Sequence, residues 1–314
     1  MDKTLYIPIL FFAWIGMSAQ GNLPYWQQHV DYTMEIDMDV NNFQYSGTQK
    51  LVYTNHSPDT LHRVFYHMYF NAFQPGSEMD MRLQSIIDPD SRMVTPEKKS
   101  KIASLSPSEI GYLRATSLKQ DGAKVQYALE GTILVVDLAN PILPGGNTSL
   151  DMVFEGQVPP QIRRSGRNSA EGIALSMVQW YPKMAEYDFE GWHDHPYIGR
   201  EFHGVWGDFD VKITIDKDYV LGGSGYLQNP DEVGHGYGTT DTQRKRRGKK
   251  LTWHFKAPMV HDFMWAADPD YLHDVVQIEN GPTMHFLYQN DPTIIDNWKK
   301  LQPKAVETME FFSK

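Results

Sequence analysis

The sequence of 314 residues contains no cysteine, which excludes disulfide bonds and leaves stability to the hydrophobic core. Positive charge is also scarce. The 29 Lys and Arg residues against 39 Asp and Glu residues give a net charge of −10. This argues against a general nucleic-acid-binding protein, which needs a basic surface. None of the 12 histidines is followed directly by glutamate, so the sequence lacks the His-Glu-x-x-His pattern of a zinc-binding helix.

The first twenty residues have the pattern of a secretory signal. Lys3 precedes an apolar run from Leu5 to Met17, and small residues follow at Ser18 and Ala19. The run is shorter than the roughly 20 residues needed to cross a bilayer, and no later segment is apolar enough to do so. We therefore expect residues 1–20 to be a signal peptide and the mature protein to be exported, periplasmic or extracellular. A buried N-terminal helix or strand is the alternative.

Most of the remaining chain alternates between apolar and polar residues, the pattern of half-buried strands. The predicted strands are Tyr32–Val40, Gln49–Asn55, Val64–Phe70, Ile133–Leu138, Leu150–Phe154, Val211–Ile215, Leu251–Phe255 and Met284–Tyr288. Many short strands with intervening turns favour a mainly β protein, an antiparallel sandwich or folded-over sheet.

Two segments interrupt the strands. Residues 88–113 are rich in proline and polar residues, and we interpret them as an insertion with a short helix that begins at Ser106 and Pro107. Residues 244–250 carry six positive charges. They are expected to form the solvated tip of a hairpin, with a polyanion-binding patch as the alternative.

The last segment has helical rather than strand periodicity. From Asp291 onward, apolar residues recur every three or four positions, the spacing of an amphipathic helix. Pro303 within this pattern predicts a break, or two helices that meet near Gln302. The pattern is still amphipathic at Lys314, from which we expect the chain to be a fragment of a longer protein.

The chain offers weak candidates for chemistry of its own. His193, His195 and His203 form its densest group of possible zinc ligands, although Pro196 disfavours a helix that would align them. A hydrogen-bonded loop is the alternative, and the better-supported one. Ser224 lacks the Gly-x-Ser-x-Gly elbow of a serine hydrolase and is expected in a turn. Residues alone neither support nor exclude a pair of glycosidase carboxylates.

Four segments together resemble the N-terminal region of aminopeptidase N-type zinc metallopeptidases of the gluzincin group, in a branch exported by Bacteroidetes-like bacteria. These segments are residues 32–53, 179–185, 207–213 and 260–266, the second reading Gln-Trp-Tyr-Pro-Lys-Met-Ala. The resemblance implies a saddle-shaped antiparallel β-sandwich over residues 21–282. Residues 283–314 would begin an α/β thermolysin-like catalytic domain that is truncated before its zinc motif.

The resemblance also implies a function and two site residues. Relatives use zinc-activated water to remove N-terminal residues from peptides, with the zinc held in a catalytic domain that this chain lacks. Peptide substrates and the missing catalytic domain would be the partners, and no metal is expected on this chain, which should be inactive alone. Gln179 and Tyr181 occupy the two positions of a loop that reaches the substrate in relatives. Tyr181 stands where they have Gln or Glu.

A different class of function is also compatible with the sequence. A secreted, non-enzymatic β-sandwich for adhesion or carbohydrate binding would share the export signal, the aromatic content and the acidic surface. It would not account for the helical segment after Asp291. Likewise, Gln179 has an ordinary alternative to substrate binding, a loop amide that satisfies neighbouring backbone groups.

Overall fold

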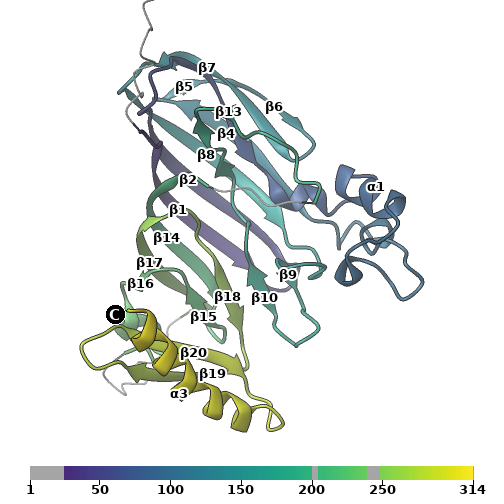
Figure 1. Cartoon of the computed structure of the whole chain (residues 1–314), viewed down its shortest axis with the longest axis vertical. Coiled ribbons are helices and arrows are strands. Elements are labelled where there is room, and N and C mark those ends of the chain that lie inside the picture. Colours follow the sequence, from purple (N-terminus) through teal and green to yellow (C-terminus); the bar gives the residue numbers. More distant parts are fainter. Residues whose placement is uncertain (1–24, 200–203, 239–247, 314) are drawn as a thin grey trace, which may run out of the picture.

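The computed structural model describes residues 25–199, 204–238 and 248–313 (Figure 1). Two predictions therefore fall outside the described residues: the signal peptide, and the basic segment 244–250 except for its last three residues. His203 also lies outside them. The described part is mainly β, as the sequence predicts, and its sheets are almost wholly antiparallel. No helix in this part is long and apolar enough to span a membrane.

The largest sheet has eight strands in the order β16-β17-β14-β1-β2-β8-β4-β5. Among the described residues, the one parallel pair in this sheet is β1 with β14, two strands that are far apart in the sequence. In chain order the strands are β1 (His29–Asp39), β2 (Gln44–Thr54), β4 (Tyr112–Gln120), β5 (Ala123–Lys124), β8 (Asn147–Gln157), β14 (Trp206–Asp216), β16 (Tyr226–Leu227) and β17 (Lys250–Val260).

Two four-stranded sheets complete the sandwich, in the orders β11-β3-β7-β6 and β15-β18-β10-β9. The first contains β3 (Leu61–His67), β6 (Gln126–Glu130), β7 (Ile133–Ile142) and β11 (Lys183–Met184). The second contains β9 (Gly166–Arg167), β10 (Leu175–Met177), β15 (Val220–Gly223) and β18 (Trp265–Asp268).

Two hairpins and six short or peripheral helices lie outside these three sheets among the described residues. Strands β12 (Tyr187–Asp188) and β13 (Gly191–Trp192) form a short hairpin, and β19 (Tyr271–Gln277) and β20 (Thr283–Gln289) form a longer one. Helix α3 (Ile295–Phe312) lies beside the β19–β20 hairpin at the lower end of the molecule in Figure 1. The other helices are η1 (Tyr69–Ala72), α1 (Glu78–Ser85), η2 (Ser91–Met93), η3 (Ile102–Ser104) and α2 (Pro230–Val233).

The core lies between the inner face of the eight-stranded sheet and the two smaller sheets. Alternate residues of β1 are buried, and β2, β8, β14 and β17 show the same alternation. The Tyr32 hydroxyl of β1 accepts a hydrogen bond of 2.9 Å from the backbone N–H of Met184 in β11, which ties the two layers together. Period-two burial of this kind is what a sheet with one solvated face requires.

Three local predictions were wrong. The third strand ends at His67 rather than Phe70, which lies in the 3₁₀ helix η1. The segment from Ser106 to Glu109 is a single turn, not a helix. In it the Ser106 hydroxyl donates to the Glu109 carboxylate at 2.7 Å. Helix α3 continues through Pro303 without a break. The carbonyl of Lys299, which Pro303 leaves without a donor, lies on an exposed turn where water can satisfy it.

The predicted domain boundary at residue 282 falls in the turn of the β19–β20 hairpin. Strand β20, expected to begin the catalytic domain, pairs along its whole length with β19, expected to end the first domain. The predicted insertion, residues 88–113, contains η2 and η3 and reaches the first two residues of β4.

Candidate functional site

The connection from residue 178 to residue 182 crosses between the two smaller sheets of the sandwich. It leaves β10, which pairs with β18, and enters β11, which pairs with β3. Several of its polar groups are hydrogen-bonded to neighbouring elements. The Trp180 indole donates to the carbonyl of Phe263 at 3.1 Å, and the Gln49 amide donates to the carbonyl of Pro182 at 2.8 Å. The Tyr45 hydroxyl donates to the carbonyl of Trp180.

Gln179 differs from these neighbours in its backbone conformation. Its backbone has a φ of 59°, in the left-handed region that side chains other than Gly, Asn and Asp rarely adopt. As a whole residue Gln179 is 9% exposed, but its amide nitrogen and oxygen are not among the buried, unsatisfied polar atoms of the described residues. A left-handed backbone at a residue other than glycine costs roughly 1–3 kcal/mol. Such features cluster at functional sites, where the surrounding structure compensates for them.

Tyr181 is fully buried, and its hydroxyl donates to the Asp262 carboxylate at 2.9 Å. Asp262 in turn pairs with the buried ammonium of Lys183 at 3.0 Å. Burial, and then the charge of Asp262, raises the pKa of the Tyr181 phenol well above its usual value, so the hydroxyl keeps its proton. Because that proton is committed to Asp262, only the lone pairs of the hydroxyl remain for another partner. The substrate-binding roles of Gln179 and Tyr181 stay predictions.

The histidines that the sequence suggested as zinc ligands separate into different surroundings. His193 pairs with Asp188 at 2.9 Å, on the β12–β13 hairpin. One donor atom each from Asp188, Glu190 and His193 lie within 4.8 Å of one another, whereas His195 belongs to no such group of described residues. The structure therefore gives His193 carboxylate neighbours within its own hairpin and separates it from His195.

Two titratable groups near this hairpin are strongly perturbed. Burial raises the pKa of the Glu186 carboxyl to about 7, against a hydrogen bond from the Tyr187 N–H that lowers it. Burial, and then the charge of Lys183, lowers the pKa of His67 to about 3. Both groups are therefore neutral over part of the range in which exposed carboxylates and imidazoles would be charged.

Ser224 is a turn residue, as expected from the sequence. It lies in a bend between β15 and β16. Its hydroxyl donates to the Met264 carbonyl at 3.3 Å and accepts from the Met264 N–H at 3.1 Å. Both contacts are with backbone atoms, so nothing in this arrangement activates the hydroxyl as a nucleophile.

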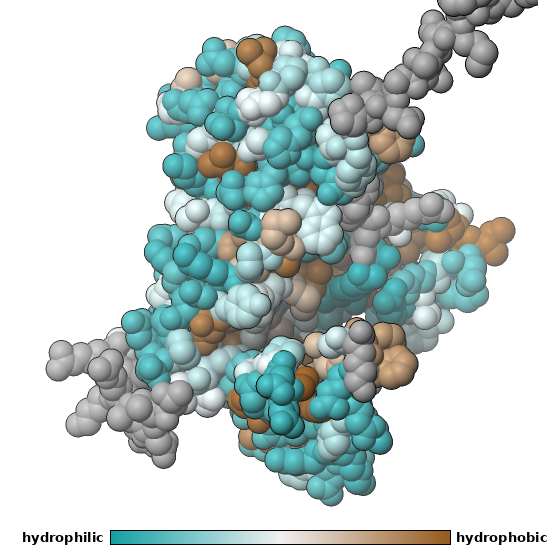
Figure 2. Space-filling view, turned by 60° about the vertical axis from the view of Figure 1, so that its left-hand side comes forward, coloured by the Kyte–Doolittle hydropathy of each residue, from teal (hydrophilic) through white to brown (hydrophobic). Residues whose placement is uncertain are grey.

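A hollow of about 1000 Å³ lies between β15–β16 and the C-terminal hairpin. Glycines form one side, and the aromatic rings of Tyr226, Phe255 and Trp298 contribute to the rest. On the face shown in Figure 2, hydrophobic side chains lie along the recess above the lowest part of the molecule. His285 also lines the hollow, and its Nδ1 lies 2.8 Å from Nε2 of His273. This histidine pair could not be predicted from the sequence, because it depends on the register of β19 and β20.

Comparisons with known proteins give structural likenesses only. No protein-family model matches the chain, and no curated protein matches it either. Among solved structures, the M1 zinc metallopeptidase of Deinococcus radiodurans is similar, at 15% identity and a TM-score of 0.39 over 82% of this chain. A mutant of an M1 zinc metallopeptidase from the same organism, bound to a Tyr-Ser-Ala substrate, matches 84% of this chain at 15% identity and a TM-score of 0.43.

A third similar structure is a two-domain M1 zinc metallopeptidase mutant bound to L-arginine, at 14% identity and a TM-score of 0.43. The chain spans 46% to 48% of the length of these three proteins. At such identities and TM-scores, the likenesses do not determine what this chain does.

Proposed function

We propose that this chain is the N-terminal part of an exported zinc-dependent aminopeptidase and that Gln179 lines its substrate cleft. The four sequence segments that resemble this family support the proposal, and they extend over nearly the whole chain after residue 20. The observation that carries it is Gln179 itself. A largely buried polar residue held on a left-handed backbone is the kind of feature that clusters at functional sites.

The amide of Gln179 suits the amino end of a peptide. Its carbonyl oxygen can accept a hydrogen bond from an ammonium group, while its NH₂ can donate to a peptide carbonyl. The neighbours that fix residues 180–182 hold the backbone of Gln179 in place, so little conformational entropy would be lost when a substrate binds. In this proposal Tyr181 does not donate a hydrogen bond to the substrate, because its proton is committed to Asp262.

The chain's own residues do not fit the zinc site of such an enzyme. No histidine in the sequence is followed by glutamate, so the helix that supplies two ligands and the general base is not encoded here. We therefore assign no hydrolytic step to these residues. The reaction would take place in a catalytic domain to which this chain contributes substrate contacts.

The first test is the coding frame beyond Lys314. The proposal expects Gly-x-Met-Glu-Asn followed by His-Glu-x-x-His within roughly the next hundred residues. If neither motif occurs, the aminopeptidase assignment fails, and a binding or adhesion module becomes the better explanation of the β-sandwich.

A kinetic test addresses Gln179 in the longer protein. Gln179→Ala should raise KM for peptide substrates about tenfold or more, as expected when a hydrogen bond to a charged amino group is lost. The exposed Gln228 offers a matched control, since its side chain bonds only to the nearby Tyr226 carbonyl. Gln228→Ala should leave both kcat and KM unchanged. An unaltered KM in the Gln179 variant would remove the residue from the cleft.

Export is part of the same proposal. It rests on the pattern of residues 1–20, with a short basic start, an apolar run and small residues at the end. Expression of the longer protein in a bacterial host, followed by N-terminal sequencing of the periplasmic and released fractions, should give a mature chain that begins near Gly21. A protein that keeps Met1 and stays in the cytoplasm would contradict it.

A further inference from the structure

The outward face of the eight-stranded sheet carries both acidic and basic residues, and three of its acids are paired with lysine. Glu35 pairs with Lys212 at 2.8 Å, and Asp37 pairs with Lys250. Asp210 receives both Lys256, at 3.2 Å, and the imidazole of His254, at 2.6 Å. At these three positions a cation lies beside the carboxylate.

Asp31 and Asp208 are exceptions to this arrangement. They lie directly opposite each other on the parallel strands β1 and β14, a position in which like charges repel. Neither forms an ion pair with lysine or arginine within the described residues. Their only side-chain partners there are His29, 3.2 Å from Asp31, and the backbone N–H of Met259, which donates to Asp208 at 2.8 Å.

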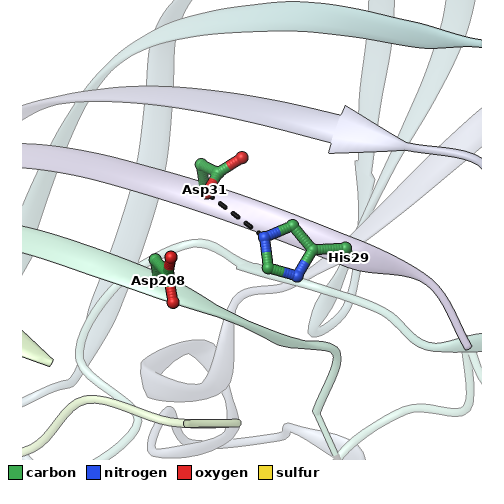
Figure 3. Close-up of side chains that lie close together, drawn as sticks. All are labelled: His29, Asp31 and Asp208. Carbon is green, nitrogen blue, oxygen red and sulfur yellow. Dashed lines mark hydrogen bonds and ion pairs between the residues drawn. The ribbon is translucent and has the colours of Figure 1, made fainter. Parts of the chain in front are cut away.

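His29 brings an imidazole to the same place. It precedes Asp31 by two residues on β1, so the two side chains share one face of the strand. Figure 3 shows the ring turned back along β1 toward both carboxylates, with Asp208 reaching the group from the neighbouring strand. One donor atom from each of the three residues lies within 4.8 Å of the other two.

We propose that His29, Asp31 and Asp208 bind a divalent transition-metal ion such as Zn²⁺. Ligand atoms around zinc at about 2.0–2.2 Å lie roughly 3–4 Å apart; here His29 and Asp31 are 3.2 Å apart, and all three donor atoms lie within 4.8 Å of one another. The imidazole favours a borderline ion of this kind over Mg²⁺ or Ca²⁺, which prefer oxygen ligands only. Three protein ligands on an exposed face leave further coordination positions to water. The ion would supply the positive charge that lysine supplies elsewhere on this face.

This site departs from the sequence expectation that the chain itself binds no metal. It is also separate from the His-Glu-x-x-His site of the proposed parent enzyme, which this chain does not encode. The sequence could not reveal it, because Asp208 reaches the other two ligands only through the parallel pairing of β1 with β14.

The test is titration of the chelator-treated full chain with ZnCl₂ at pH 7, followed by calorimetry. The expected result is a zinc site whose Kd rises at least tenfold in Asp31→Asn and in Asp208→Asn. Asp210→Asn is the matched control, since Asp210 lies on the same strand and face as Asp208 but is already paired with Lys256. It should bind zinc like the unaltered chain.

Thermal unfolding separates loss of the site from loss of the fold. Without zinc, Asp208→Asn should unfold at the same temperature as the unaltered chain or higher, because a carboxamide keeps the acceptor for Met259 and removes the repulsion. With zinc, the unaltered chain should gain thermal stability and the variant should not.

Three results would overturn the proposal. The first is the absence of zinc binding to the unaltered chain. The second is equal binding in all of these variants. The third is binding lost only when Asp188→Asn is made, which would place the metal on the β12–β13 hairpin with Glu190 and His193.

Discussion

Two buried tyrosines of this protein differ in whether the hydroxyl has a hydrogen-bond partner. The hydroxyl of Tyr181 is fully buried and donates to Asp262, whose charge makes the hydrogen bond stronger than one between neutral groups. The hydroxyl of Tyr66 is equally buried but has no hydrogen-bond partner among the described residues. A hydroxyl that loses water without gaining a partner destabilises the folded state.

The two tyrosines therefore predict opposite responses to the same substitution. Tyr181→Phe should lower the free energy of unfolding by about 1.5–3 kcal/mol, because it removes a hydrogen bond to a carboxylate. Tyr66→Phe should leave it unchanged or raise it by up to about 1 kcal/mol, because it removes an unpaired hydroxyl. Urea denaturation of both variants measures the difference. Equal losses would mean that the Asp262 contact adds nothing to stability.

At the scale of elements, the sequence predicts strands well where one face of the strand is buried. The alternation from Tyr32 to Val40 corresponds to β1, whose burial pattern follows the same period. Which strands pair with each other could not be predicted in the same way. Residues 29–37 and 206–214 pair in parallel although the intervening chain is long. No local pattern encodes that pairing, so His29 and Asp31 could be placed on one face from the sequence but Asp208 could not be added to them.

The sequence also fails to predict local backbone structure where the surroundings of a residue in the fold determine its conformation. Pro303 removes one backbone donor from α3, a real cost, but the affected turn is exposed and the helix continues. The left-handed backbone of Gln179 carries no sequence signal, because glutamine has no preference for that conformation. The resemblance alone pointed to this segment, while the strain at Gln179 became visible only in the fold.

The parallel pairing of β1 with β14 depends on a glycine at its start. A Cβ atom on Gly207 would lie 1.8 Å from the carbonyl oxygen of Val30, next to the irregularity in the β14–β17 pairing. Gly207→Ala should therefore lower the free energy of unfolding by about 2–4 kcal/mol, since backbone must move to admit the methyl group. Thermal or urea unfolding gives the value.

Gly223 provides the matched control for this substitution. A Cβ atom there would meet the Phe255 ring at 3.5 Å, an ordinary contact distance. Gly223→Ala should change stability by less than about 1 kcal/mol. A Gly207 variant as stable as the Gly223 variant would show that β1 and β14 can separate without cost at this end.

At the scale of the whole molecule, the structure has a well-buried sandwich and a less buried C-terminal part. Helix α3 contains no buried residue. It is attached to the β19–β20 hairpin by stacking of Trp298 on Tyr288, with ring centroids 5.3 Å apart, and by the Gln302 amide, which donates to Asp274 at 2.6 Å. Few buried contacts mean a low cost of local opening, independent of the core strands.

Hydrogen exchange should reveal this difference directly. Amides of α3 should exchange through local opening, well before those of β1 and β2, which exchange only on global unfolding. Trp298→Ala should speed exchange in α3 about tenfold by removing the stacking contact, with no change in β1 or β2. Phe311, whose side chain is largely exposed, is the control, and Phe311→Ala should alter neither region. If α3 is instead protected as strongly as β1, the helix belongs to the same cooperative unit as the sandwich, and Trp298→Ala should then destabilise the whole chain.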